Sequence, residues 1–301
     1  MLLSIAFAVL SSLSYGFSDF FAGRAAARLT VIRTTALVYL CATGLVGVAL
    51  AFYGVGWSGP AVLWGSVAGV FAIVGFLGFY AGMAFGPMSL VSPLIAVLES
   101  MVPVGVAIVR GDALPPLAWA AIGLAIVSGV LISVQRSERH VRITPRTLVI
   151  AVVSGLTLGL SITALDYAPS DSHLVPAFVE LAAGLVLVAA LMGLAAIAPR
   201  LRRALTGLDP DSGTSHSHHM GRRAAVWMVV TGGVLLGASN ALLVLALQLG
   251  DLAVVSVIVG IYPLATIVLA RLVLKERMSA VQASGVVLAL IATTVLALNS
   301  M

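Results

Sequence analysis

Charged side chains make up only 9% of this 301-residue sequence, whereas hydrophobic residues account for 61% of it. An ordinary soluble domain carries about 25% charged residues, so this composition excludes a soluble fold of the usual kind. The mean hydropathy of +1.15 leads to the same conclusion. We therefore expect an all-α integral membrane protein.

Cysteine and lysine are equally scarce, with one residue of each, Cys41 and Lys275. A single cysteine excludes a disulfide within the chain and any zinc motif built from several cysteines. Cys41 lies in an apolar run, where a small buried residue is expected. The net charge of +5 does not indicate nucleic-acid binding, because the basic residues lie in the connections between apolar segments.

Motifs of hydrolases, metalloproteases and ATP-driven proteins are missing, so we expect no enzyme activity, no cofactor and no metal site. The run GVGWSG at 54–59 matches the dinucleotide-binding pattern, but it joins two apolar segments and no strand precedes it. Three histidines, His216, His218 and His219, lie in a polar segment that is typical of a flexible loop.

Long apolar segments dominate the chain, and a helix needs about 20 such residues to cross a bilayer. The first segment lacks the basic start of a cleaved signal peptide, so we interpret it as a span. Two longer connections are polar, a linker at 135–146 and a loop at 198–223 that we expect to be flexible. We predict ten transmembrane helices, at 2–22, 31–52, 61–84, 89–109, 115–134, 147–167, 173–197, 224–247, 252–273 and 279–298.

Basic residues are concentrated on one side of this arrangement. Of the 16 arginines and lysines, 15 fall in or beside odd-numbered connections, and Arg110 alone falls on the other side. Basic loops stay on the cytoplasmic side of a membrane. We therefore expect odd-numbered loops in the cytoplasm, both termini outside, and a multi-pass protein of a bacterial plasma membrane.

The chain contains an internal repeat. Residues 89–113 align without gaps to residues 253–277, which lie 164 positions later, and this alignment pairs Ser92 with Ser256 and Glu99 with Pro263. A repeat of five spans must insert the second copy upside down, as in many secondary transporters. We predict two inverted five-helix repeats, 1–134 and 147–301.

The run YPLATIVLARLVLKERMSAVQASGVVLALIA at 262–292, with its weaker counterpart at 102–132, resembles the EamA-type transporters of the drug/metabolite transporter superfamily. The pair Glu276-Arg277 followed by Gly285 fits the family pattern, in which each half ends with a short acidic turn and a glycine-containing span. The resemblance implies a transporter of small metabolites that is often an exporter.

Three acids lie inside predicted spans, and an unpaired carboxyl group is costly there, by roughly 3 kcal/mol on insertion scales. Glu99 is at the centre of its span, and Asp19 and Glu180 are the other two proton or cavity candidates. Pro103 has no N–H and deprives the Glu99 carbonyl of its helical partner, and Pro263 does the same for Val259. Acids without a nearby cation favour the protonated form, which suits a proton carrier.

Polar and aromatic residues in the spans are candidates for contact with a substrate, although hydrogen bonds between helices would explain them equally well. The candidates are Tyr15, Tyr80, Ser92, Asn240, Ser256 and Pro263. Glycines at four-residue spacing, such as Gly65 with Gly69 and Gly233 with Gly237, predict close helix packing. We expect a monomer or a weak dimer.

The simplest hypothesis is a proton-coupled exporter of amino acids or related compounds, with a small-molecule substrate, protons and the lipid bilayer as partners. An uncoupled facilitator remains an alternative. A membrane enzyme acting on lipid-linked substrates would need clustered polar residues near one interface, and a non-transporting subunit would have a solid core around Glu99.

Overall fold

The computed structural model describes residues 2–53, 56–85, 88–111, 116–133, 145–209 and 221–274, together with 280–281, 283–285, 287–288 and 291. Within these ranges the regular secondary structure is helical. The helices are α1 (Leu2–Leu29), α2 (Val31–Tyr53), α3 (Gly59–Phe85), α4 (Met88–Arg110), α5 (Pro116–Ser133), α6 (Pro145–Asp166), the short η1 (Ser170–Ser172), α7 (Val175–Ile197), α8 (Pro199–Thr206), α9 (Arg222–Leu249), α10 (Leu252–Val259) and α11 (Pro263–Leu274).

Seven stretches of helix in the described part of the chain are long and apolar enough to cross a membrane, which confirms a membrane protein with several spans. They are Leu2–Ala26, Val31–Phe52, Gly59–Phe85, Pro145–Asp166, Val175–Ile197, Arg222–Leu249 and Leu252–Leu269. Helices α4 and α5 coincide with two further predicted spans. Most of the predicted tenth span, 279–298, lies outside the described residues.

The structure differs from the sequence predictions at three places, two in predicted spans and one in a predicted loop. Helix α1 continues past residue 22 to Leu29, because the arginines of its last turns tolerate helical structure beyond the apolar part. The ninth span is not one helix, since α10 ends at Val259 and α11 begins at Pro263, which lacks the N–H that a continuous helix requires. Residues 199–206 of the predicted flexible loop form α8.

Glycines let the helix backbones approach closely, as their spacing predicted. A Cβ added to Gly69 on α3 would lie 2.5 Å from the carbonyl oxygen of Glu180 on α7. A Cβ added to Gly233 on α9 would lie 2.7 Å from the carbonyl oxygen of Val38 on α2. Both distances are too short for any side chain, so these two seams depend on glycine.

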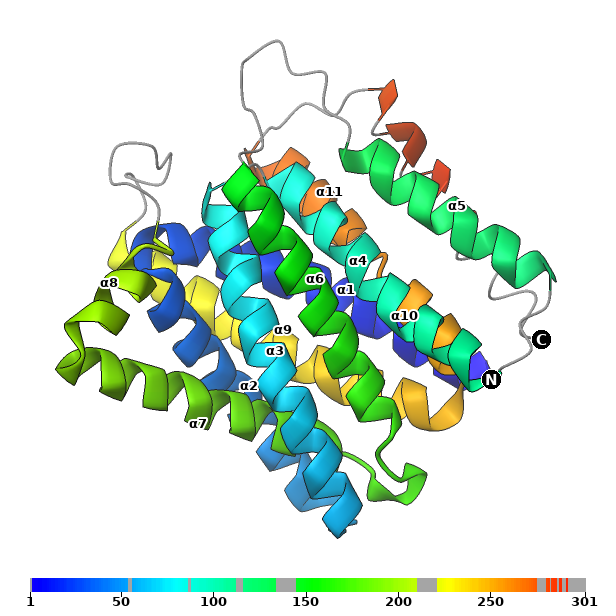
Figure 1. The fold of residues 1–301 in the computed structure, drawn as a ribbon, viewed down its shortest axis with the longest axis horizontal. Coiled ribbons are helices and arrows are strands. Elements are labelled where there is room, and N and C mark those ends of the chain that lie inside the picture. Colours follow the sequence, from blue (N-terminus) through cyan, green and yellow to red (C-terminus); the bar gives the residue numbers. More distant parts are fainter. Residues whose placement is uncertain are drawn as a thin grey trace.

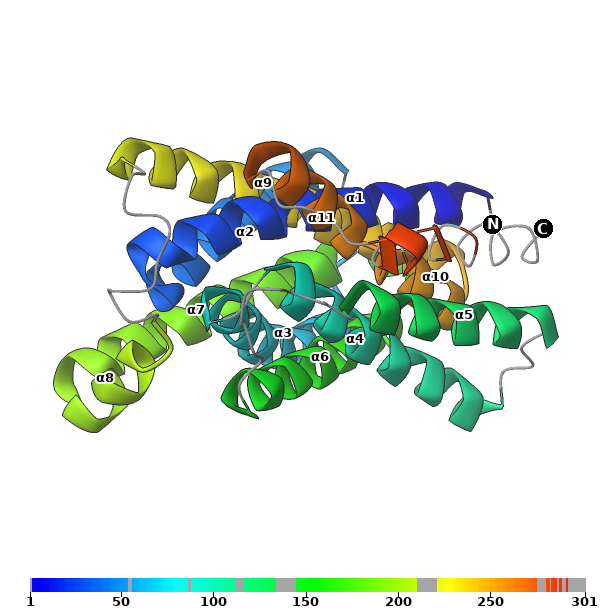
Figure 2. The same ribbon diagram turned by 90° about the horizontal axis from the view of Figure 1, so that it is seen from above.

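The long helices run back and forth through the molecule (Figure 1). Seen from above, α1 and α9 lie in one layer, and α3, α4 and α6 lie in a second (Figure 2). Within the layers α1 packs along α9, α3 along α6, and α4 along α6, while α2 packs on α7 and α4 on α10. Polar side chains from several of these helices meet between the layers.

Candidate functional site

All three acids that the sequence singled out are buried, with exposed fractions of 2% for Asp19, 7% for Glu99 and 2% for Glu180. They come from α1, α4 and α7. Asp19 and Glu99 are close enough for their carboxyl groups to interact electrostatically.

The break between α10 and α11 brings Tyr262 to this acid pair. Tyr262 lies in the turn that joins the two helices, and it is buried. Its hydroxyl group lies near the Glu99 carboxyl group but makes no hydrogen bond with the described residues. It is also within electrostatic range of Asp19. Residues from α1, α4 and the α10–α11 turn therefore meet at one point.

Glu180 is held on the other side of the site. Its Oε1 accepts a hydrogen bond of 3.2 Å from the hydroxyl of Ser161 on α6. Tyr15 and Tyr39 are within electrostatic range of the same carboxyl group. Because Gly69 packs directly on the Glu180 backbone, the position of this acid is fixed by the contact between α3 and α7.

Aromatic rings connect the two acidic regions. Tyr39 packs edge-on against Phe76 at 5.9 Å between ring centroids, and Phe76 contacts Tyr80 at 5.8 Å. Phe79 contacts both Tyr80, at 5.7 Å, and Tyr262, at 6.3 Å. Tyr262 in turn contacts Tyr15 at 6.2 Å. We call these six rings and the three acids, with Asn240, the central cluster.

Asn240 joins the central cluster through a hydrogen bond of 2.9 Å that its Oδ1 accepts from the hydroxyl of Tyr15. Several other polar atoms of the cluster make no hydrogen bond with the residues that the structure describes. These atoms are Asp19 Oδ1, Glu99 Oε2, Glu180 Oε2, Asn240 Nδ2 and the hydroxyls of Tyr39, Tyr80 and Tyr262. Buried polar atoms normally have partners, so this concentration is typical of a binding site.

The remaining candidates take different positions. Ser92 is fully buried, and its hydroxyl has no hydrogen-bond partner in the described part of the chain. The Ser256 hydroxyl instead donates to the carbonyl of Leu252 in its own helix. Pro263 starts α11 and so makes the break that positions Tyr262.

The two carbonyls that proline leaves without helical partners are both covered in the structure. The Val259 carbonyl accepts hydrogen bonds from the Ser12 hydroxyl at 3.1 Å and from the Tyr262 N–H at 3.0 Å. The Glu99 carbonyl lies against Gly159, where an added Cβ would be only 2.5 Å away. The polar lining consequently comes from side chains.

Arg110, the basic residue on the sparsely charged side, pairs with Asp166 at 2.6 Å and joins the end of α4 to the end of α6. Its guanidinium group also lies 3.9 Å from the centre of the Tyr167 ring, which stacks on Trp64 at 4.7 Å. We call these four residues the outer link. They tie together the ends of α3, α4 and α6.

The central cluster contains the three acids, Tyr15, Tyr80 and Asn240, which the sequence singled out, and it adds Tyr39 and Phe79, which the sequence did not. Tyr39 lies in an apolar stretch of α2 with no acid or proline near it, so no local signal marks it. Within the described ranges, no group of three or more His, Cys, Asp or Glu side chains could hold a metal ion.

Comparison with known proteins gives one family. The sequence profile of the EamA-like transporter family matches residues 145–298, about half of the chain. A crystal structure of a protein with 16% sequence identity is similar over 99% of this chain and 96% of that chain, with a TM-score of 0.67. At this identity the likeness shows the fold alone. No curated protein matches the chain.

Proposed function

This chain belongs to the EamA-like transporter family, and we propose that it is a secondary transporter that exports amino acids or related small metabolites. The central cluster is the observation that carries the proposal, because it gathers acids, hydroxyls and an amide from helices far apart in the sequence. Among the described residues none of these three acids forms an ion pair, and acids buried in membrane spans commonly mark transport pathways.

Reciprocal contacts favour ten spans arranged as two inverted repeats, 1–134 and 147–301. The contact of Gly69 with the Glu180 backbone recurs in the contact of Gly233 with the Val38 backbone. The two glycines are 164 residues apart, which is the spacing of the sequence repeat. Contacts exchanged in this way between two halves are expected from a two-fold axis in the membrane plane.

A second pair of contacts obeys the same rule. The Ser11 hydroxyl on α1 donates to the Ser239 carbonyl on α9 at 2.9 Å. The Ser154 hydroxyl on α6 donates to the Gly75 carbonyl on α3 at 2.7 Å. Since Gly75 and Ser239 are also 164 residues apart, α1 stands to α9 as α6 stands to α3. Rocking of the layers about the central cluster would then provide alternating access.

Proton coupling follows from the chemistry of Glu99. Its carboxyl group is buried and lies within electrostatic range of Asp19 and Tyr262. A neutral acid there is far cheaper than a charged one, so Glu99 would bind a proton when no cationic group replaces it. Exchange of a proton for a substrate amine on one carboxylate gives the simplest antiport cycle.

The same cluster suggests which part of the substrate is recognised. A positively charged amino group pairs with carboxylates and also binds aromatic faces, by about 2 kcal/mol where water is excluded. Tyr15, Tyr39, Tyr80 and Tyr262 belong to one chain of contacting rings, and each lies within electrostatic range of at least one of the acids. Asn240 Nδ2 could donate to a carbonyl or carboxylate oxygen of the same molecule.

Binding is tested by a thermal-unfolding screen of the purified protein against amino acids, polyamines and their N-acetylated counterparts. A ligand that binds the folded state raises the unfolding temperature, and the stabilisation grows with the logarithm of its concentration above Kd. We expect stabilisation by at least one free amine and none by its acetylated form, and we expect Glu99→Gln to abolish the stabilisation. Stabilisation by acetylated compounds alone would overturn amine recognition.

Transport itself is tested by counterflow in proteoliposomes with the stabilising amine. Uptake that requires unlabelled amine inside the vesicles supports a transporter, and binding without any flux would contradict it. An uncoupled facilitator would show counterflow yet never accumulate the amine against its gradient when a pH gradient is imposed. A membrane enzyme would convert the compound chemically, which analysis of the recovered amine detects.

A further inference from the structure

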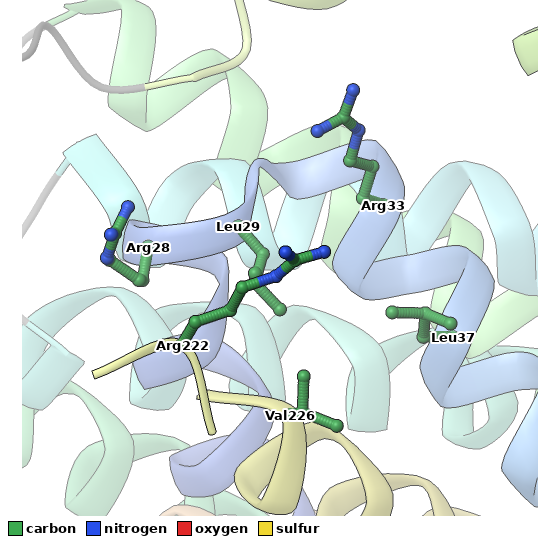
Figure 3. Close-up of a pocket in the computed structure, with 6 residues that line it drawn as sticks. All are labelled: Arg28, Leu29, Arg33, Leu37, Arg222 and Val226. Carbon is green, nitrogen blue, oxygen red and sulfur yellow. The ribbon is translucent and has the colours of Figure 1, made fainter. Parts of the chain in front are cut away.

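A cavity of about 310 Å³ lies away from the central cluster, where the end of α1 and the starts of α2 and α9 meet. Figure 3 shows three arginines around it, with apolar side chains beside them. The lining residues are Arg28, Leu29, Arg33, Leu37, Arg222 and Val226. This end of the helices carries most of the positive charge of the sequence, which marks the cytoplasmic side.

The lining changes from cationic to apolar in the same direction on two helices. On α2, Leu37 lies one turn deeper than Arg33, and on α9, Val226 lies one turn deeper than Arg222. Both apolar residues are substantially exposed, at 40% for Leu37 and 43% for Val226. The exposed stripe continues along α2 at Leu40. The cavity therefore offers cations at its outer rim and a hydrocarbon surface beneath them.

We propose that this cavity binds one anionic phospholipid of the cytoplasmic leaflet, with its phosphate on the arginines and its acyl chains along Leu37 and Val226. Basic pockets between spanning helices on this side of a membrane are suited to acidic headgroups. Guanidinium groups bind phosphate oxygens in paired hydrogen bonds. A soluble anion would use the arginines but leave the apolar lower part of the cavity without a function.

The guanidinium groups, and not a helix end, carry this site. The first N–H of α2, on Val31, already donates a hydrogen bond of 2.8 Å to Asp209 Oδ1, so this N–H is not available to a ligand. Arg33 and Arg222 are exposed and form no ion pair with other residues of the described ranges. Their positive charge is consequently available to a lipid headgroup.

The test is the thermal unfolding temperature of the full-length protein in detergent with added phosphatidylglycerol, phosphatidylcholine or inorganic phosphate. We expect phosphatidylglycerol to stabilise the wild type more than phosphatidylcholine does, and we expect phosphate alone to have no effect. In Arg33→Gln/Arg222→Gln the apparent affinity for phosphatidylglycerol should fall about tenfold or more, because each arginine near the headgroup contributes to lipid binding.

The matched control is Arg200→Gln/Arg202→Gln, which removes two exposed charges of α8 on the same side of the membrane. This control should keep the wild-type response to phosphatidylglycerol. Equal losses in both double variants would show general charge attraction and overturn a specific site, as would equal stabilisation by the two lipids. Stabilisation by phosphate alone would identify a soluble anion instead. None of these outcomes depends on transport activity.

Discussion

The hydroxyl of Tyr15 on α1 donates a hydrogen bond of 2.9 Å to Oδ1 of Asn240 on α9, across 225 residues of sequence. Both side chains are buried. The bond orients the amide so that Nδ2, which has no hydrogen-bond partner among the described residues, is available to a ligand. The pair thus links helix packing to the binding chemistry of the central cluster.

Tyr15→Phe should lower the free energy of unfolding by about 0.6 kcal/mol, the average for hydrogen bonds between membrane helices, and by no more than about 2 kcal/mol. Thermal or denaturant unfolding of the purified variant measures this loss. Because the bond is shared, Asn240→Ala should add little to Tyr15→Phe in a double-mutant cycle. Strictly additive losses would mean that the two side chains do not act together.

Gly69→Ala should destabilise the protein strongly, because the new methyl group would lie 2.5 Å from the Glu180 carbonyl oxygen and force α3 from α7. We expect a loss of about 1–3 kcal/mol, read from the unfolding temperature. Gly44→Ala on α2 is the matched control, because an added Cβ meets nothing within 4 Å there. A loss in Gly44→Ala as large as that in Gly69→Ala would contradict a packing role specific to Gly69.

Arg110→Gln should cost only about 0–1 kcal/mol of stability, because its ion pair with Asp166 is partly exposed and screened by salt. Arg110→Lys keeps the charge but loses the planar group over Tyr167, so it should resemble Arg110→Gln. Unfolding temperatures of both variants at low and high salt measure these effects. If Arg110→Lys behaves as the wild type, charge alone holds the outer link.

Amine binding to the central cluster should weaken as the pH falls, because a protonated Glu99 no longer attracts a cation. Titration of the stabilising amine at several pH values, followed by intrinsic fluorescence or calorimetry, gives the apparent Kd. In Glu99→Gln the Kd should be higher and should vary less with pH. Binding that strengthens on acidification would reverse the assigned role of this acid.

The sequence was most informative where a residue conflicts with its apolar surroundings. Glu99, Asp19 and Glu180 stand out because acids are costly in a membrane, and all three are buried in the structure. Tyr15 and Asn240 each stood out as a polar side chain within an apolar span. Their mutual hydrogen bond could not be predicted, because it depends on how α1 packs along α9.

Helix packing also decides the features that were not predicted. Pro263 indicated a carbonyl without its helical partner, but the Ser12 hydroxyl on α1 and the Tyr262 N–H in the turn cover it, and neither contact is visible in the sequence. Tyr39 belongs to the site because α2 and α3 bring it against Phe76, a contact that no spacing within α2 reveals. In α8, a segment that contains three arginines and two leucines forms a helix where polar composition had suggested a flexible loop.

Proton-driven transport through Glu99 is tested most directly in proteoliposomes with an acidic interior, an alkaline exterior and labelled amine outside. Proton–amine exchange predicts that the wild type accumulates the amine above its external concentration, and that a protonophore abolishes this accumulation. Glu99→Gln should keep its fold and lose gradient-driven accumulation. Accumulation by Glu99→Gln at the wild-type rate and with the wild-type pH dependence would contradict the role of Glu99 as the proton carrier.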